Sequence, residues 1–223
     1  MGKILAPLRD TEEWKRLLSE PERRWYRGAP ACALARFWQE TDGLPESVKR
    51  LFTTQQRFAD FETLLAIPEH RVELPGGSYP AQNDLWALGR TKLGLVSVAV
   101  KALGHEPFGP TLAEWQMDLS SGKRRRLQYL CSILDLQPPL PGRIRYPLLK
   151  WTASAILEAI RFHARDAVLL VHSFSPVQPW LEDFRAFCLL FDAPGTPGDL
   201  MPAGERMGVG LHLAWVDDYP RRG

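Results

Sequence analysis

The chain of 223 residues is 45% hydrophobic and 24% charged, with a formal net charge of +2. This length favours a single domain with a sizeable core. The nearly neutral charge excludes a general attraction to polyanions, so any nucleic-acid binding must come from a local patch. The three cysteines are far apart and lack metal-ligand spacing, which predicts reduced core residues in a cytoplasmic protein. No apolar run has the length of a signal peptide or a membrane span, so no membrane association is expected.

Residues 1–57 are predicted to form a helical extension. Thr11, followed by two glutamates, is typical of a helix start, because a threonine side chain caps the first turn and acids favour that end. Apolar residues at helical spacing predict further helices over 31–39 and 45–52. The same spacing, with Phe58, Phe61 and Leu65 on one face, predicts another helix over 58–66.

After Pro68 the pattern changes to that of strands. Residues 70–74 alternate apolar and polar side chains, which predicts a short strand before a Pro-Gly-Gly turn. Two further strands are expected over 84–88 and 95–100. The latter is rich in valine and apolar at nearly every position, which is typical of a strand covered on both faces.

The second half of the chain alternates between the two patterns. Helices are predicted around Leu112, over 121–136, over 146–163 and over 179–191, and strands over 168–171 and 209–216. Residues 193–208 read as a Gly/Pro loop and 217–223 as a frayed tail. Apolar strands between helices predict a single α/β domain. Its core, residues 58–216, is expected to contain a mixed sheet between helices, with the helical extension packed on it.

Asp84 opens the second of the three expected strands, and Lys101-Ala102-Leu103 closes the third. Together with the element order from Phe58 to Ser173, these positions resemble the αβββαβ core of the restriction-endonuclease-like fold, the PD-(D/E)XK nuclease superfamily. They also resemble an uncharacterised bacterial family with this layout. In that superfamily an Asp opens the second strand, as Asp84 does, and an acid-x-Lys triplet closes the third. Here Lys101 stands at the acid position and Leu103 at the lysine position.

The resemblance implies a site that needs two carboxylates for Mg²⁺ and a lysine beside the attacking water. Lys101 would place a positive charge where the cation belongs, so one reading is a degenerate site with a binding or regulatory role. The other is an active phosphodiesterase with a rearranged site, in which Asp84, Lys101 and Glu106 are catalytic. Mg²⁺ would then be held by Asp84 together with Glu106, with His105, or with Glu62 from the preceding helix. A third reading is a protein-interaction module unrelated to nucleic acid, with Asp84 a turn residue.

Two further groups of polar residues are candidates for binding. Basic residues at a helix start oppose the helix dipole, so a DNA or RNA backbone is one explanation and a solvated face the other. This basic run comprises Lys123, Arg124, Arg125 and Arg126. Polar residues near the ends of the expected strands are candidates for lining a pocket at that edge, namely Asn83, His105 and His172.

Overall fold

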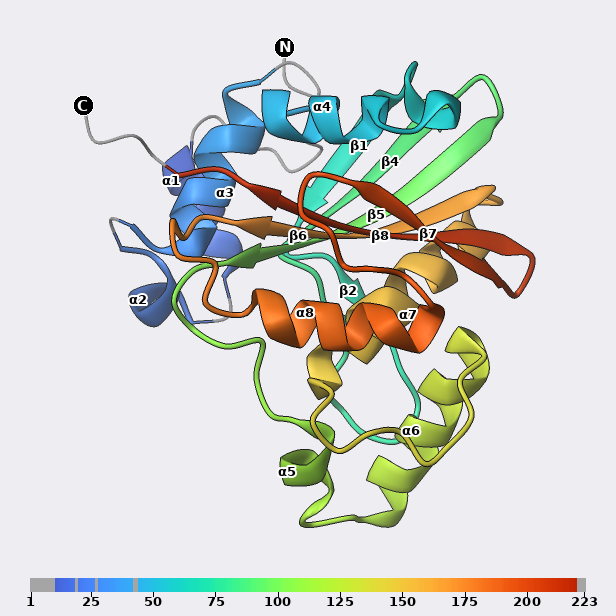
Figure 1. The fold of residues 1–223 in the computed structure, drawn as a ribbon. Coiled ribbons are helices and arrows are strands. Elements are labelled where there is room, and N and C mark those ends of the chain that lie inside the picture. The colour runs from blue at the N-terminus through green and yellow to red at the C-terminus, as the bar shows by residue number, and fades with distance from the viewer. Residues whose placement is uncertain (1–10, 19, 27, 42–43, 220–223) are drawn as a thin grey trace.

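The computed structural model describes residues 11–18, 20–26, 28–41 and 44–219. A six-stranded mixed sheet with strand order β1-β4-β5-β6-β8-β7 runs through its centre, which confirms an α/β fold with a mixed sheet between helices (Figure 1). A separate two-stranded hairpin is formed by β2 (Arg71–Val72) and β3 (Ala81–Gln82). The strands of the large sheet are β1 (Glu62–Pro68), β4 (Leu85–Thr91), β5 (Gly94–Leu103), β6 (Asp166–Ser173), β7 (Leu200–Arg206) and β8 (Val209–Asp217).

The connections between strands decide whether they pair antiparallel or parallel. β1, β4 and β5 are antiparallel neighbours, and Lys92 and Leu93 alone form the turn between β4 and β5. β6 lies parallel to β5 and β8 parallel to β6, since a parallel neighbour requires a crossover and helices supply it here. The first crossover contains α5 (Leu112–Gln116), α6 (Ser121–Leu134) and α7 (Tyr146–Arg161), and the second α8 (Leu181–Cys188), η3 (Leu189–Phe191) and β7.

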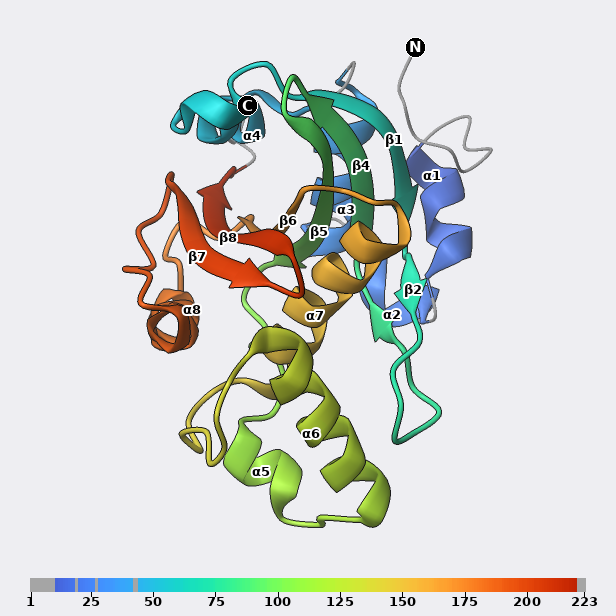
Figure 2. The ribbon, with the colours of Figure 1, turned by 90° about the vertical axis from the view of Figure 1, so that its right-hand side faces the viewer.

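Helices cover both faces of the sheet (Figure 2). Val98 and Val100 of β5 pack with the N-terminal helices on one face, while Ala99 and Leu103 pack with α7 on the other, which explains the nearly continuous apolar run. No helix in the described part of the chain is long and apolar enough to cross a membrane. The N-terminal elements are α1 (Thr11–Trp14), η1 (Lys15–Leu17), α2 (Pro21–Arg24), α3 (Pro30–Gln39), α4 (Glu46–Thr53) and η2 (Gln56–Phe58).

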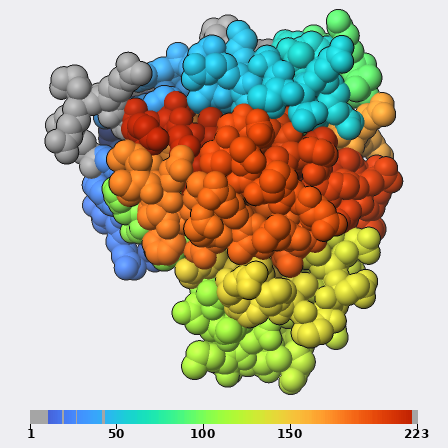
Figure 3. Space-filling model, in the orientation of Figure 1, coloured from blue at the N-terminus to red at the C-terminus, as the bar shows by residue number. Residues whose placement is uncertain are grey.

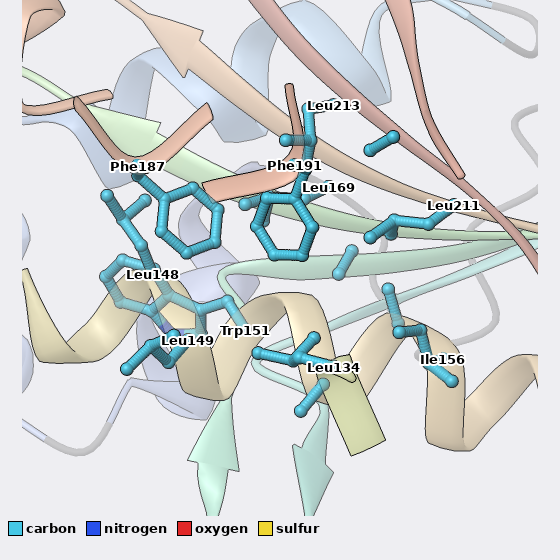
Figure 4. Close-up of a cluster of buried hydrophobic side chains, with 14 of the residues drawn as sticks. Leu134, Leu148, Leu149, Trp151, Ile156, Leu169, Phe187, Phe191, Leu211 and Leu213 are labelled. Atoms are coloured by element: carbon cyan, nitrogen blue, oxygen red, sulfur yellow. The ribbon is translucent and has the colours of Figure 1, made fainter. Parts of the chain in front are cut away.

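The larger core lies between the sheet and the helices α7 and α8. Figure 4 shows Leu149 and Trp151 of α7 lying below Phe187 of α8, with Leu169 and Leu213 of the sheet above them near Phe191. α6 packs against α7 away from the sheet, and the α5–α6 region forms the lobe at the bottom of the space-filling view (Figure 3). α7 therefore connects the sheet to this lobe.

Two sequence-based assignments are wrong. The helix predicted over 58–66 is in fact a 3-10 turn followed by β1, which pairs with β4 from Glu62 to Pro68. A register shift between Thr63 and Leu65 interrupts the alternation of apolar and polar residues that a regular strand shows. The apolar residues of this segment therefore matched a helical spacing as well. The loop predicted over 193–208 contains β7, an edge strand in which Pro202 and a second register shift disguise the alternation.

The tail predicted to be frayed begins with ordered residues. Asp217 is the last residue of β8, and the backbone N–H of Asp218 donates to the carbonyl of Ser173. Residues 220–223 lie outside the described residues. The expected strand over 70–74 is reduced to two residues, Arg71 and Val72, which pair only with β3.

Candidate functional site

Asp84 and Lys101 lie opposite each other at one end of the neighbouring strands β4 and β5, and we call this end the sheet edge. Asp84 directly precedes β4, and the pairing of Leu85 with Val100 in the antiparallel ladder sets it opposite Lys101. The Lys101 Nζ lies 2.6 Å from Asp84 Oδ2, and the backbone N–H of Ala102 donates to the same oxygen at 2.8 Å. The carboxylate is therefore held by two cross-strand contacts that follow directly from the strand register.

A second cation and a second carboxylate complete this network. Arg24 of α2 donates from Nη2 to Asp84 Oδ1 at 2.8 Å. The same guanidinium makes a two-point contact with Glu69, with 2.9 Å from Nη1 to Oε2 and 3.2 Å from Nη2 to Oε1. The amide of Gln82 also donates to Glu69. The charges of Asp84, Glu69, Arg24 and Lys101 thus compensate one another, and we call these four residues the edge network.

Both carboxylates of the edge network are nearly enclosed, since Glu69 is 7% exposed and Asp84 3%. Burial and the negative charge of Asp84 raise the pKa of Glu69 to about 7, although Arg24 and Gln82 act in the opposite direction. For this carboxyl group, desolvation outweighs the attraction of its partners. A fraction of Glu69 is therefore protonated at neutral pH.

An open pocket exposes one side of the edge network. Its lining includes Arg24, Asp84 and Lys101, together with the exposed Arg23 and Glu106 and the first residues of α3. The structure thus brings together the three residues predicted as catalytic, Asp84, Lys101 and Glu106. Glu106 reaches the pocket because it lies three residues after Leu103, the last residue of β5.

Glu62 is not part of this site, which corrects the prediction that it ligates a metal. It begins β1 at the opposite end of β4 from Asp84 and is ion-paired with Arg90 at 2.8 Å. The position expected from a helix was wrong because the chain is a strand here. Glu69, the residue after the end of β1, occupies the acidic place near Asp84 instead.

The predicted pocket residues Asn83 and His105 do not line the pocket beside Asp84. Asn83 is buried beneath α7, where its Oδ1 accepts a hydrogen bond from Ser154 at 3.0 Å. His105 is exposed, and its backbone carbonyl accepts from the indole of Trp180 at 3.0 Å. Asn83 and Asp84 point apart because alternate residues of extended chain face opposite ways.

His172 is a buried connector rather than a pocket residue. The Trp38 indole donates to its Nδ1 at 3.2 Å, so Nε2 carries the proton and donates to Asp218 Oδ2 at 2.9 Å. Ser47 donates to the same carboxylate of Asp218. Burial lowers the pKa of His172, which keeps the ring neutral. Both ring nitrogens are engaged, so His172 joins α3 and α4 to the end of β8 and has no free nitrogen for catalysis.

Two of the four residues of the basic run at the start of α6, Lys123 and Arg126, are engaged within the protein. Arg126 is buried, which contradicts its prediction as a nucleic-acid contact. Lys123 donates to the carbonyl of Trp115 at 2.9 Å and lies over that ring, whereas Arg124 and Arg125 are exposed. Lys123 and Arg126 are cations at a helix start because their side chains bind backbone carbonyl groups of neighbouring segments. The Arg126 guanidinium donates to four carbonyl groups of the β2–β3 loop, those of Leu74, Pro75, Gly77 and Tyr79.

The edge network includes residues that sequence reasoning did not single out. Arg24 lies in a four-residue helix far from Asp84 in the chain, and no spacing connects the two. Glu69 has a positive φ of 52° directly after β1, and an acid following a proline at the end of a run was the one local signal for it. Lys150 and Trp151 were read only as part of a long helix.

Lys150 of α7 lies next to the edge network. Its Nζ is 5.6 Å from the centre of the Trp151 ring, and Lys101 Nζ is 5.0 Å from the same ring. Burial and the charges of Lys101 and Arg126 lower the pKa of Lys150 to about 8, while Asp84 acts in the opposite direction. Three cationic side chains therefore gather at this point.

The donor groups of the edge network do not fit the Mg²⁺ that the nuclease resemblance implies. Both oxygens of Asp84 are engaged by cations, as are both oxygens of Glu69. Among the described residues, no group of three or more His, Cys, Asp or Glu is arranged to hold a metal ion. A guanidinium and an ammonium group occupy the positions around Asp84 that a cation would take.

Comparison with known proteins gives a single match. The model of a family described as a domain of unknown function (DUF6946) matches residues 7–220. No curated protein and no solved structure matches the chain. Because the match extends over nearly the whole chain, the protein belongs to the DUF6946 family.

Proposed function

We propose that this chain is a cytoplasmic, nuclease-like protein that binds the phosphate backbone of DNA or RNA at the sheet edge without cleaving it. The observation that carries this proposal is the pairing of Asp84 with Lys101 and Arg24 at 2.6 and 2.8 Å. This pairing removes the carboxylate that a metal-dependent nuclease requires. It also places two cations in the wall of an open pocket.

The strand order supports the nuclease-like part of the proposal. The resemblance rests on a helix predicted over 58–66 and a first strand predicted over 70–74, but β1 takes the place of that helix and 70–74 contributes only the two-residue β2. The same order of elements is obtained with α4 as the helix, the antiparallel β1, β4 and β5 as the three strands, and α7 leading to β6 parallel to β5. Asp84 precedes the second of these strands. The acid-x-Lys triplet can be placed on β5 in two ways, and each lacks the acid. One puts Lys101 at the acid position, and the other takes Lys101 as the lysine and puts the buried Ala99 there.

The energetics favour binding over cleavage. A divalent cation would have to displace an ammonium and a guanidinium from a buried carboxylate, and breaking a buried pair costs about 3–5 kcal/mol. A phosphate group can share these cations with Asp84 instead of displacing them, because an ammonium group has three N–H donors and a guanidinium group five. Arg23, exposed at the pocket rim, adds to the positive charge.

The test combines a cleavage assay with a binding assay. We expect no cutting of labelled DNA or RNA with Mg²⁺ or Mn²⁺, and binding by fluorescence anisotropy that weakens from 50 to 200 mM salt, as phosphate contacts do. Lys101→Met should weaken binding about tenfold. Lys92→Met is the matched control, since this exposed lysine lies in the turn at the other end of β5. Cutting that Asp84→Ala abolishes would refute the proposal.

One observation favours a second candidate, an active phosphodiesterase with a rearranged site. Glu106 lines the same pocket as Asp84 and Lys101 and is exposed. This candidate requires a divalent cation to bind with Glu106 as a ligand. Calorimetry with Mn²⁺ distinguishes the two, since the rearranged site predicts heat that Glu106→Gln removes and the proposal predicts none. A chain that binds no nucleic acid at any salt concentration would instead favour a protein-interaction module.

A further inference from the structure

Trp151 forms a fixed wall beside the edge network. Its indole N–H donates to the backbone carbonyl of Gln82 at 2.9 Å, and its ring packs in the core with Phe108. It is 5% exposed. Because α7 and β3 both hold this ring, the side chains that lie along it are confined to a narrow region.

Two lysines use this wall, and they differ in their partners. Lys101 Nζ is paired with Asp84 at 2.6 Å. Lys150 Nζ lies over the Trp151 ring, and no carboxylate in the described part of the chain is within ion-pairing distance of it. A half-buried ammonium group without a counter-ion is costly, because burial and neighbouring positive charge both disfavour its charged form.

The charge around Lys150 is positive on balance. The charges of Lys101 in β5 and Arg126 in α6 disfavour the protonated form of Lys150, and the charge of Asp84 at the start of β4 favours it. Asp84 is already shared between Lys101 and Arg24. The positive side chains around Lys150 therefore exceed the negative ones by one or two charges.

We propose that Lys150 and Lys101 together hold one phosphate group against Trp151. A tetrahedral phosphate has enough oxygens to accept a hydrogen bond from each ammonium group at once, and its charge supplies what the cluster lacks. This inference rests on the proposed function and deepens it, since it identifies a phosphate of the polynucleotide as the bound group and Lys150 as its second ligand. Free inorganic phosphate shares the same chemistry.

The first experiment follows the amine of Lys150 directly. The Cε signals of lysine are recorded by NMR against pH, with the Lys150 signal assigned by its loss in Lys150→Met. Without phosphate, Lys150 should titrate near pH 8. With inorganic phosphate its pKa should rise toward the ordinary lysine value of about 10.4, because the anion stabilises the charged form. A pKa of Lys150 that phosphate leaves unchanged would overturn the proposal, and this readout uses the unmodified protein.

The second experiment measures affinity by anisotropy with an oligonucleotide that does or does not carry a 5′-phosphate. Lys150→Met should weaken binding about tenfold, a typical effect of losing one charge-assisted contact. Lys150→Arg should stay close to the wild type, and Lys92→Met is the control. Between pH 7 and 9 the wild type should lose affinity while Lys150→Arg does not, because arginine remains charged. A greater loss with the 5′-phosphorylated strand would identify a terminal phosphate, and an equal loss an internal one.

The outcomes separate this proposal from the proposed function. Oligonucleotide binding that Lys150→Met leaves intact would overturn the Lys150 site and keep the nucleic-acid function. Phosphate binding at Lys150 without any oligonucleotide binding would keep the site, assign it to free phosphate and overturn the nucleic-acid function.

Discussion

Two buried aspartates, at opposite ends of the inner strands of the same sheet, are held in similar ways. Asp84 precedes β4 and Asp166 begins β6, and each is paired with an arginine from the N-terminal third at 2.8 Å. Each also has a second partner from a neighbouring strand, Lys101 for Asp84 and His212, at 3.1 Å, for Asp166. An arginine paired with a buried aspartate is thus how this fold attaches its first helices to the sheet.

The surroundings of the two aspartates differ. The ring of Phe58 lies 4.8 Å from that of His212 and 5.4 Å from the guanidinium of Arg57. Of these two partners of Asp166, His212 is buried, with 4% of its side chain exposed, whereas Arg57 is 35% exposed and lines a surface pocket. Asp84 lines an open pocket and is accompanied by a second carboxylate, Glu69. An ion pair alone therefore says little about function, and neither does a pocket, since Arg57 beside Asp166 also lines one. The excess of positive charge that Lys150 adds near Asp84 is what distinguishes the candidate binding site.

The largest expected effect comes from removing Asp166. Asp166→Ala leaves the buried His212 without its carboxylate partner, whereas Arg57, 35% exposed, can turn to water. The free energy of unfolding should therefore fall by about 3–4 kcal/mol. Urea denaturation measures the change. Affinity for oligonucleotides, corrected for the folded fraction, should stay within about twofold of the wild type. Weaker binding by folded Asp166→Ala protein would break the distinction between the two aspartates.

Removing Asp84 should have a smaller effect on stability and a different effect on binding. Arg24 and Lys101 are 28% and 21% exposed, so water can partly replace the lost carboxylate and Asp84→Ala should cost about 2–3 kcal/mol. The two released cations should bind phosphate more tightly, by several-fold in anisotropy. Weaker binding by Asp84→Ala would show instead that Asp84 itself orients the ligand. The two aspartates would then differ in their location in the sheet and not in whether their carboxylate opposes phosphate.

The most gradual expected effect is the pH dependence that Glu69 introduces, because it is spread over more than two pH units. Its folded-state pKa of about 7 lies above its ordinary value, so between about pH 4.5 and 7 the folded protein keeps a proton that the unfolded chain has lost. The contribution of Glu69 to stability is therefore complete below pH 4.5 and is lost as the pH rises to about 7, with a slope of at most about 1.4 kcal/mol per pH unit. Urea denaturation from pH 5 to 8 should show that Glu69→Gln removes this slope. An unchanged slope would assign it to another group.

Local pattern was informative where strands and helices are long and regular. The valine-rich run became β5, the apolar spacing after Tyr146 became α7, and Asp84 was correctly expected to open a strand. Pattern failed where the fold deviates from a strict period. Register shifts disguised β1 as a helix and β7 as a loop, so Glu62 was assigned to the wrong element and the wrong end of the sheet.

The sequence by itself determined the α/β class, the apolar strands and the opposition of an aspartate and a lysine across neighbouring strand ends, because these depend on periodicity and short connections. Only the tertiary structure decided what surrounds Asp84. Arg24, Glu69 and Lys150 reach it from α2, the end of β1 and α7, and contacts between elements distant in the chain leave no spacing signal. The same holds for Arg126, whose charge was readable in the sequence but whose burial against four carbonyl groups was not.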